Sequence, residues 1–441
     1  MERYFGSLDL QTNCTGEYEE PVSVADVRSA IGAGPAIARG AGVSFVGASF
    51  GDACRTVATH HLDRVLSFDP EQLRVTVEPG ISLGELYNFL VPRGLYLTVQ
   101  PGHPQISVGG CVGSNVHGKN PFRDGVFADV VAELELFHPD HGVLRLSREQ
   151  QPDLFELTCG GFGLTGIILS VTLRLKRLPS TRVEVRKKPV RNLVEACEQV
   201  ESLKDDSDFL YAWADISHFD ARLGRGYICR GRFVVEGGER AVPCPMPSYG
   251  RLPARTAPPR LPRLFQPWIL PWVTEAHFRW ETRPRRHPAH LFDILYPGMH
   301  TAYYFDIYGR SGFFAHMVLL PIDRWRAYIG RLENVFREHR VPITALAIKA
   351  FDGTQRLLTF NGTGFSLHSH IPNSERGRAL LSALEDLSRD FGLIRTIYFD
   401  SRLTASEARS MYPEYDDFKQ RLHLFDPRRR FVSSLSRRLG L

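Results

Sequence analysis

Three short glycine-rich stretches have the composition needed to bind an anion through the backbone. They are ARGAGVSFVGAS (38–49), PGHPQISVGGCVGSNVHGKN (101–120) and CGGFGLTGII (159–168). Closely spaced glycines and small residues present amide N–H groups to an anion, most often a phosphate. None of the three matches the phosphate loop of nucleoside triphosphatases, and the first lacks the spacing of a dinucleotide fingerprint. Any one of them alone could be a structural loop, but together they indicate phosphate binding by many amide donors.

The elements that must position these stretches alternate between strands and helices. Residues 82–94 form an amphipathic helix with Leu83, Leu86 and Leu90 on one face, ended by Gly94. A Pro-Asp-His-Gly turn at 139–142 predicts a hairpin between two apolar runs. Further strands are predicted at 36–40, 73–78, 96–99 and 164–175.

The second half continues in mixed α/β style, apart from residues 241–290. That span holds eleven prolines, and it has eight arginines after residue 250 against only Glu275 and Glu281 as acids. Proline at this density disfavours regular structure, so we expect an irregular surface excursion. Within it, LFQPWILPWV (264–273) either packs on the parent domain or forms a lid or membrane-facing patch. Beyond it we expect helices at 322–338 and 374–391, strands at 343–351 and 364–370, and a helical tail from 400.

The totals exclude several classes of protein. The chain has 441 residues, enough for two domains, and a formal net charge of +5 that does not by itself imply nucleic acid. Nearly all of the positively charged residues are arginines. This reflects either composition bias or a need to bind anionic substrates or a membrane surface. The seven scattered cysteines argue against a disulfide framework or a structural zinc site and predict no metal. Without a signal peptide or spanning segment, we expect a cytoplasmic location, with peripheral membrane contact as an alternative.

Taken together, the glycine stretches resemble the FAD domain of the vanillyl-alcohol oxidase / p-cresol methylhydroxylase superfamily. Within it the chain is most similar to the decaprenylphosphoryl-ribose 2-oxidases. The matching elements include HGKN (117–120) and LTGII (164–168). Others lie near the end of the chain: DSRLTASEARSMYP (400–413), Asp426, Pro427 and RRL (437–439). The resemblance is strong to about residue 176, thin through the middle and strong again from residue 400.

The resemblance implies an α+β, two-domain FAD-linked oxidase fold. Residues 1–180 would form a PCMH-type FAD-binding domain, 181–394 an inserted α/β substrate or cap domain, and 395–441 a segment returning to the first domain. FAD would be held non-covalently, because Val43 stands where many members carry a histidine that bonds to the flavin. The implied FAD-binding residues are Arg39, Gly40, Ala41, Gly42, Val43, Ser44, Gly102, Ser107, Val108, Gly109, Gly110, Ser114, Val116, His117, Gly118, Asn120, Gly163, Thr165, Gly166 and Ile167.

The resemblance also implies hydride transfer from an alcohol carbon to flavin N5, with a base taking the hydroxyl proton. Lys349 matches a pocket lysine and would act as base or as a phosphate-binding cation, unless it is a solvated strand lysine. His117 would lie beside the flavin, and Tyr308 matches a pocket tyrosine; packing is the alternative role for each.

Two departures from that family bear on the substrate. His368 stands in place of a pocket cysteine, and Phe399 in place of a lysine near the flavin. His368 could serve as a base near neutral pH. The alternative for this His-Ser-His strand is one histidine facing inward and one outward, with no catalytic duty.

These features predict oxidation of a secondary alcohol on a sugar or sugar-like substrate, phosphorylated or lipid-linked, with oxygen or a quinone as electron acceptor. One alternative is an oxygen-using aldonolactone or alditol oxidase. Another, suggested by the loss of lysine at Phe399, is a catalytically lapsed flavin protein that partners a reductase or epimerase. A third, suggested by the arginine-rich span and tail, is a protein that binds lipid phosphate.

Overall fold

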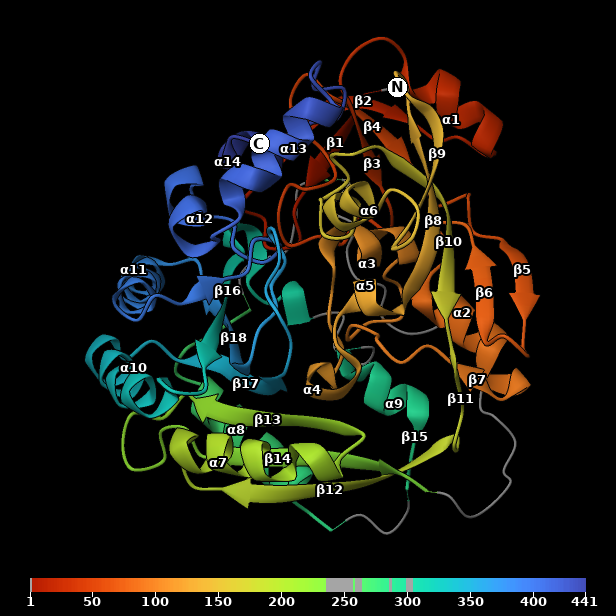
Figure 1. The fold of residues 1–441 in the computed structure, drawn as a ribbon. Helices are drawn as coiled ribbons and strands as arrows, with labels where there is room; N and C mark the ends of the chain where they lie inside the picture. Colours follow the sequence, from red (N-terminus) through yellow and green to blue (C-terminus); the bar gives the residue numbers. More distant parts are fainter. Residues whose placement is uncertain (1, 235–256, 258–263, 285–287, 299–303) are drawn as a thin grey trace.

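The chain has an α+β fold built on three sheets, seen in a computed structural model (Figure 1). The structure describes residues 2–441 except 235–256, 258–263, 285–287 and 299–303. The four-stranded sheet has the order β1 (Glu2–Gly6), β2 (Asn13–Glu19), β4 (Arg55–Ala58), β3 (Ala36–Arg39). The five-stranded sheet has the order β5 (Val65–Asp69), β6 (Arg74–Val77), β10 (Ile167–Arg174), β8 (Val131–His138), β9 (Gly142–Ser147).

The third sheet is the largest and comes from the second half of the chain. Its order is β15 (Ala289–His290), β12 (Arg182–Val190), β14 (Gly226–Phe233), β13 (Phe209–Ile216), β17 (Ile343–Phe351), β18 (Gly364–Pro372), β16 (Phe313–Pro321), β19 (Ile394–Arg395). A short pair joins β7 (Leu95–Tyr96) to β11 (Lys176–Arg177).

The helices cover the sheets and close the chain at its C-terminal end. In the first half they are α1 (Val24–Ile31), α2 (Leu83–Leu90), α3 (Val108–Ser114), α4 (Pro121–Asp124), α5 (Phe127–Val130) and α6 (Pro152–Thr158). In the second half they are α7 (Leu193–Leu203), α8 (Leu270–Glu281), α9 (Leu291–Leu295), α10 (Trp325–His339), α11 (Glu375–Asp390), α12 (Ala405–Met411), α13 (Tyr415–Phe425) and α14 (Ser434–Leu439).

The eight-stranded sheet has two faces with different tasks, because successive side chains of a strand point to opposite sides. One face packs in a continuous core with α7, α10 and α11, and it includes Ala212 and Ile348. The neighbouring residues Trp213 and Lys349 therefore lie on the opposite face. That face meets α8 along one part and, as shown below, a cavity along another.

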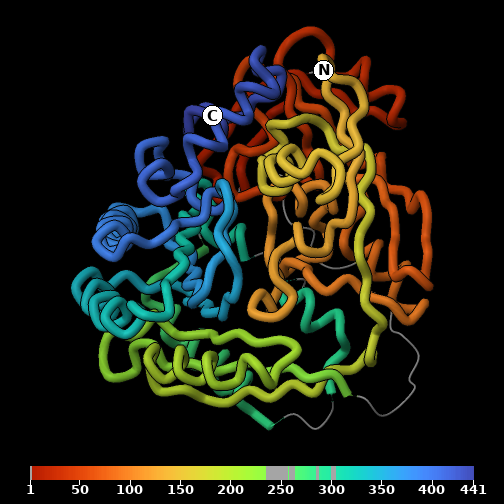
Figure 2. Tube along the Cα trace, in the orientation of Figure 1, coloured from red at the N-terminus to blue at the C-terminus, as the bar shows by residue number. Residues whose placement is uncertain are grey.

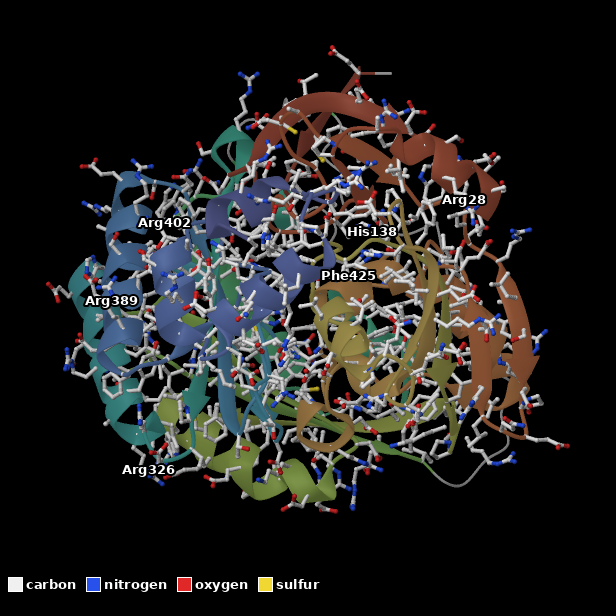
Figure 3. All side chains as sticks on the ribbon, turned by 45° about the horizontal axis from the view of Figure 1, so that its top comes forward. Arg28, His138, Arg326, Arg389, Arg402 and Phe425 are labelled. Atoms are coloured by element: carbon white, nitrogen blue, oxygen red, sulfur yellow. The ribbon has the colours of Figure 1, made fainter. Side chains whose placement is uncertain are left out.

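The C-terminal helices return to the first sheet, so the two ends of the chain lie close together (Figures 1 and 2). Ala36 bridges to Phe431, and the Ser434 amide donates to the Phe50 carbonyl at 2.8 Å. The C-terminal segment also contacts β8: His138 packs edge-on against Phe425 of α13, with 5.1 Å between the ring centroids (Figure 3). Segments more than 300 residues apart in sequence thus form one packed unit.

Most of the predicted elements are confirmed, and two predictions are wrong. The helix at 82–94 is present as α2, which Ser82 and Glu85 begin with a reciprocal capping box, followed by one short turn that ends at Gly94. The strand predicted at 96–99 covers only Leu95–Tyr96, because its pairing with β11 is two residues long.

The second wrong prediction concerns 241–290, which contains a regular twelve-residue helix, α8. Its first prolines stand before or in the opening turn, where a missing N–H costs no helical bond, and no proline follows within the helix. Residues 241–256, 258–263 and 285–287 lie outside the described part of the chain.

A buried cluster of charges secures the returning segment. The Arg395 side chain is 3% exposed and pairs with Asp400 at 3.0 Å, Glu385 at 3.3 Å and Glu407 at 2.5 Å. Burial raises the pKa of Glu385 to about 7, against the lowering effect of Arg402 and Arg395. Arg395, together with Arg402 at 3.0 Å from Glu385, therefore compensates carboxylates that would otherwise repel each other in a poorly solvated site.

We expect Arg395→Met to lower the free energy of unfolding in urea by about 3–5 kcal/mol, because it leaves buried carboxylates without their partner. Arg331→Met is the matched control, since Arg331 pairs with Asp390 at 3.4 Å and both side chains are largely exposed. The control should lose less than about 1 kcal/mol. Equal losses in the two variants would show that the cluster does not secure the fold.

Candidate functional site

A cavity of about 410 Å³ lies between the three glycine-rich stretches and the uncovered face of the eight-stranded sheet. Each of the three stretches contributes lining residues. Side chains from β16, β17 and β18 line it as well, including Met317, Lys349 and His368. The sequence-predicted glycine loops and the sequence-predicted pocket residues therefore share one space.

The first loop reaches the cavity because β3, the edge strand that pairs in parallel with β4, ends at Arg39, directly before the lining residue Gly40. Gly40 has no room for a side chain, since a Cβ there would lie 2.1 Å from Ser107 Oγ of the second stretch. Gly42 has φ +71°, a conformation that favours glycine. The loop can thus bring backbone close to a ligand only because these two positions lack side chains.

Arg39 supports this loop and does not line the cavity. Its buried guanidinium donates to Ser49 Oγ at 2.9 Å and to the Gly42 carbonyl at 3.4 Å. Burial lowers its pKa to about 10. Ser44 and the four residues before it, 40–43, do line the cavity.

The second and third stretches complete the glycine-lined wall. α3 carries Gly109, Gly110 and Gly113, all of which line the cavity, and Gly109 also packs tightly on Pro79. A Cβ on Gly113 would lie no closer than 3.8 Å to other protein atoms. The other predicted residues of these stretches that line the cavity are Gly102, Ser107, Ser114, Val116, His117, Gly163, Thr165 and Gly166.

Besides Arg39, four residues predicted to contact the cofactor do not line the cavity: Val108, Gly118, Asn120 and Ile167. Val108 and Ile167 are fully buried in the core, and Ile168 lines the cavity in place of Ile167. The Asn120 side chain donates to the Thr98 carbonyl and to Asp124, so it holds the loop.

The Gly118 carbonyl joins two of the candidate catalytic residues. Lys349 Nζ donates to it at 3.3 Å, and His117 Nδ1 lies 3.1 Å from it. Burial lowers the pKa of Lys349 to about 8. Burial also holds the pKa of His117 well below its usual value, helped by the nearby charge of Lys349.

His368 and His370 both line the cavity, with ring centroids 4.7 Å apart. The alternative of one inward and one outward histidine is wrong, because residues two apart in a strand share a face. Burial holds the pKa of His368 well below its usual value, and burial lowers that of His370 to about 3. Within the described residues, the Nε2 atoms of both rings have no hydrogen-bond partner.

Tyr308 lies behind the cavity rather than on its lining. Its hydroxyl is 3.1 Å from that of Tyr304, which is in turn 3.0 Å from His370 Nδ1 and also bonds Thr344. The structure thus places Tyr308 two hydrogen bonds from a cavity residue. Sequence reasoning missed Tyr304 and His370, although the second histidine of the His-Ser-His strand was a usable signal.

His368 and Phe399, the two positions that the sequence singled out for the substrate, are neighbours in space. The rings of His368 and Phe399 stack at 4.7 Å with an interplanar angle of 11°, and both line the cavity. Phe45 meets Phe399 edge-on at 4.5 Å and continues the aromatic lining with Phe305. Phe45 and Phe305 were not predicted; Phe45 lies within the first glycine-rich stretch, and Phe305 belongs to none of the three.

Outside the cavity, His138, Asp140 and Asp426 bring potential metal-ligand atoms within 4.8 Å of one another. Other interactions already use this group. His138 Nδ1 accepts from the Asp140 amide at 3.1 Å, and the Asp140 carboxylate pairs with Arg428 at 3.6 Å. These interactions are consistent with a structural role, in which the three residues hold the C-terminal segment against the β8–β9 hairpin.

Comparison with known proteins gives a consistent result. Residues 20–147 match the family model described as an FAD binding domain. The decaprenylphosphoryl-beta-D-ribose oxidase of Mycolicibacterium smegmatis is 26% identical over 92% of this chain and 89% of its own length. The L-gulonolactone oxidase of Mus musculus is 34% identical over 36% of this chain and 38% of its own length. The L-galactono-1,4-lactone dehydrogenase 2 of Oryza sativa subsp. japonica is 34% identical over 26% of this chain and 19% of its own length.

We expect Gly113→Val to raise the dissociation constant for FAD by at least about tenfold, or ~1.4 kcal/mol, because the added side chain occupies the cavity wall without a clash in the protein. Gly330→Val is the control, since Gly330 lies in a helix with open space around its Cβ. Fluorescence titration of the FAD-stripped protein measures both constants. Unchanged FAD affinity in Gly113→Val would remove this wall from the cofactor site.

Proposed function

Because the chain belongs to the FAD-linked oxidoreductases that share this FAD binding domain, we propose that it oxidises a secondary alcohol of a sugar or sugar-like substrate, phosphorylated or lipid-linked. The observation that carries the proposal is the shared cavity, in which glycine loops face Lys349 and His368. Such a cavity brings a bound dinucleotide and an anionic alcohol together. The proposed substrate class follows the ribose oxidase that matches most of the chain.

The residues present fit FAD. Gly40 and Gly42 leave the first loop bare, and α3 presents Gly110 and Gly113 to the same cavity. Bound FAD supplies the hydride acceptor, at its N5 atom. The chain's own residues bind and orient FAD and the alcohol, and one of them accepts the proton of the alcohol hydroxyl. Val43 lines the cavity in the first loop, and a valine cannot bond covalently to the flavin, which favours dissociable FAD.

His368 is the proposed proton acceptor for the substrate hydroxyl. Its low pKa keeps the imidazole neutral near pH 7, so it can accept a proton, and Nε2 has no partner among the described residues. As the C–H hydride leaves the alcohol carbon, the O–H proton passes to this ring and the carbon becomes a carbonyl. His370, Tyr304 and Tyr308 form a hydrogen-bonded chain behind it that would support proton movement.

Lys349 is proposed as a cation for an anionic substrate group. It already donates to the Gly118 carbonyl, which favours the ammonium form, and it lies where desolvation strengthens its attraction for a phosphate. His117 is a positioning residue in this scheme, because it contacts the same carbonyl as Lys349.

The proposed division of labour assigns FAD binding to 1–180 and 395–441, and substrate binding to 181–394. The glycine loops of the cavity come from the first span and β16, β17 and β18 from the second, which supports this division. The returning segment contributes the lining residues Tyr398 and Phe399.

An oxygen-using aldonolactone or alditol oxidase is the second candidate, favoured by the partial matches to the gulonolactone and galactonolactone enzymes. Peroxide release in air, measured with and without a quinone or dye acceptor, separates an oxidase from a dehydrogenase. Anaerobic bleaching of the flavin by any member of a panel of sugars, sugar phosphates and polyols would exclude a catalytically lapsed partner protein.

We expect His368→Ala to slow anaerobic flavin reduction by about 10²–10⁴-fold, because the hydroxyl proton loses its acceptor while FAD stays bound. The substrate is whichever compound of that panel bleaches the parent protein. His423→Ala, at an exposed site on α13, is the control. Reduction at the parent rate in His368→Ala would show that another group accepts the proton.

Lys349 should give the reaction a pH dependence. Its pKa of about 8 means that the cation is present below pH 8 and lost above it. The second-order rate constant for flavin reduction should therefore fall as the pH rises through about 8, and Lys349→Met should lack that step. A rate that rises through the same pH would assign Lys349 the role of base instead. Lys188→Met, on the exposed side of β12, should keep the parent profile.

A further inference from the structure

We propose that the outward face of α8 and the segment before it dock this protein onto a bilayer surface that contains anionic lipid. The tryptophan face, as we name it, consists of Leu264, Trp268, Ile269, Trp272, Val273 and Trp280. Its docking can be tested on the flavoprotein without any substrate, so it does not depend on which alcohol is oxidised.

The tryptophan face concentrates the exposed apolar side chains of the molecule. Eleven large apolar residues are exposed in the described part of the chain, and six of them belong to this face. Trp268, Trp272 and Trp280 are 72%, 76% and 65% exposed. Single exposed apolar residues need no explanation, but a contiguous set of this kind marks an interaction site.

α8 meets the protein through several polar contacts, in addition to Leu270 and Phe278 on the same side. Thr274 is buried and bonds Ser217 at 2.7 Å, and His277 Nε2 lies 3.1 Å from the Tyr227 hydroxyl. Glu275 pairs with Arg225, and Glu281 pairs with Lys187.

The opposite side of α8 is correspondingly apolar. Ile269, Trp272, Val273, Ala276 and Trp280 follow the i, i+3, i+4, i+7, i+11 spacing of one helix face, and all are exposed. Such a stripe gains free energy only by contact with something apolar. Because the polar contacts fix the helix on the sheet, the stripe is held outward rather than left to fold inward.

Charge favours an anionic lipid surface as the partner. Both acids of the segment 264–284, Glu275 and Glu281, are engaged toward the sheet. Its two arginines, Arg279 and Arg283, are exposed. Arg279 also pairs with Glu275 at 2.6 Å, and Arg283 lies 5.4 Å from the Trp280 ring centroid. Tryptophan beside arginine is the composition of interfacial helices, in which the ring enters the headgroup region and the cation meets lipid phosphate.

The position of the face ties it to the cavity. α8 covers the same side of the eight-stranded sheet that lines the cavity further along. Phe265 and Leu270, at the inner side of the segment, pack with Tyr308 and Phe313 in one aromatic cluster. Phe45, Phe305 and Phe399 pack against that cluster and line the cavity. Docking would therefore bring the cavity wall close to the lipid surface.

The geometry fits surface docking rather than insertion across the bilayer. α8 has twelve residues and a length of about 18 Å. In the part of the chain that the structure describes, no helix combines the length and hydropathy needed to cross a membrane.

The experiment is flotation of the FAD-loaded protein with vesicles of phosphatidylcholine alone or with phosphatidylglycerol. We expect flotation with the anionic vesicles, weakened by salt, and a drop of at least about tenfold in partitioning for the double variant Trp272→Ala, Trp280→Ala. Leu66→Ala, Leu424→Ala is the matched control, because these exposed residues lie outside the tryptophan face. Arg279→Gln, Arg283→Gln should weaken binding to anionic vesicles and leave flavin absorbance unchanged.

Bromine-labelled lipids give a second measurement, because they should quench exposed tryptophans and spare the largely buried Trp325. Failure of the parent protein to float, or equal flotation of the tryptophan variant and the control, would overturn the proposal. A dimer in solution that dissociates only when the tryptophans are substituted would also overturn the proposal. That result would assign the tryptophan face to contact with a second copy of the chain. None of these outcomes would affect the proposed oxidation.

Discussion

The hydrogen bond from Lys349 to the Gly118 carbonyl is the contact on which the site depends. It connects β17 of the large sheet to the stretch that follows α3, and so joins the two halves of the cavity across 231 residues of sequence. A lysine in this position has little water around it, and its pKa falls to about 8 for that reason. The same desolvation keeps the surrounding histidines neutral. This contact thus joins the two halves of the cavity at a place where desolvation controls the charge of the titratable side chains.

The alternation of side chains in the eight-stranded sheet explains how one layer serves two purposes. Ile348 and Leu367 enter the core beneath the helices, while Lys349 and His368, one position along, enter the cavity. The packed face stabilises the sheet and leaves the other face free to vary its chemistry.

The glycine loops could be predicted from sequence because their function constrains the residue type directly. Gly40 and Gly42 allow almost no alternative, and that restriction is visible in the sequence as a pattern. Lys349 and His368 could be predicted through the resemblance. His370 could have been predicted from the His-Ser-His strand, because residues two apart in a strand share a face. Phe45, Phe305 and Tyr304 could not, because their roles follow from how distant segments pack. The strand predicted at 96–99 failed for a similar reason, since the length of a strand depends on its partner.

The span 241–290 shows why composition alone misled. Proline density predicted irregular structure, but the effect of a proline depends on where it stands, and those next to α8 fall before it or in its first turn. The apolar residues of 264–273 divide between the two alternatives that the sequence left open: Phe265 and Leu270 pack on the protein, and Trp268, Ile269 and Trp272 face outward. What separates the two groups is the polar anchoring of Thr274, Glu275, His277 and Glu281 on the sheet. Those partners, Ser217, Arg225, Tyr227 and Lys187, come from β12, β14 and the loop after β13, and no reading of the segment by itself could have identified them.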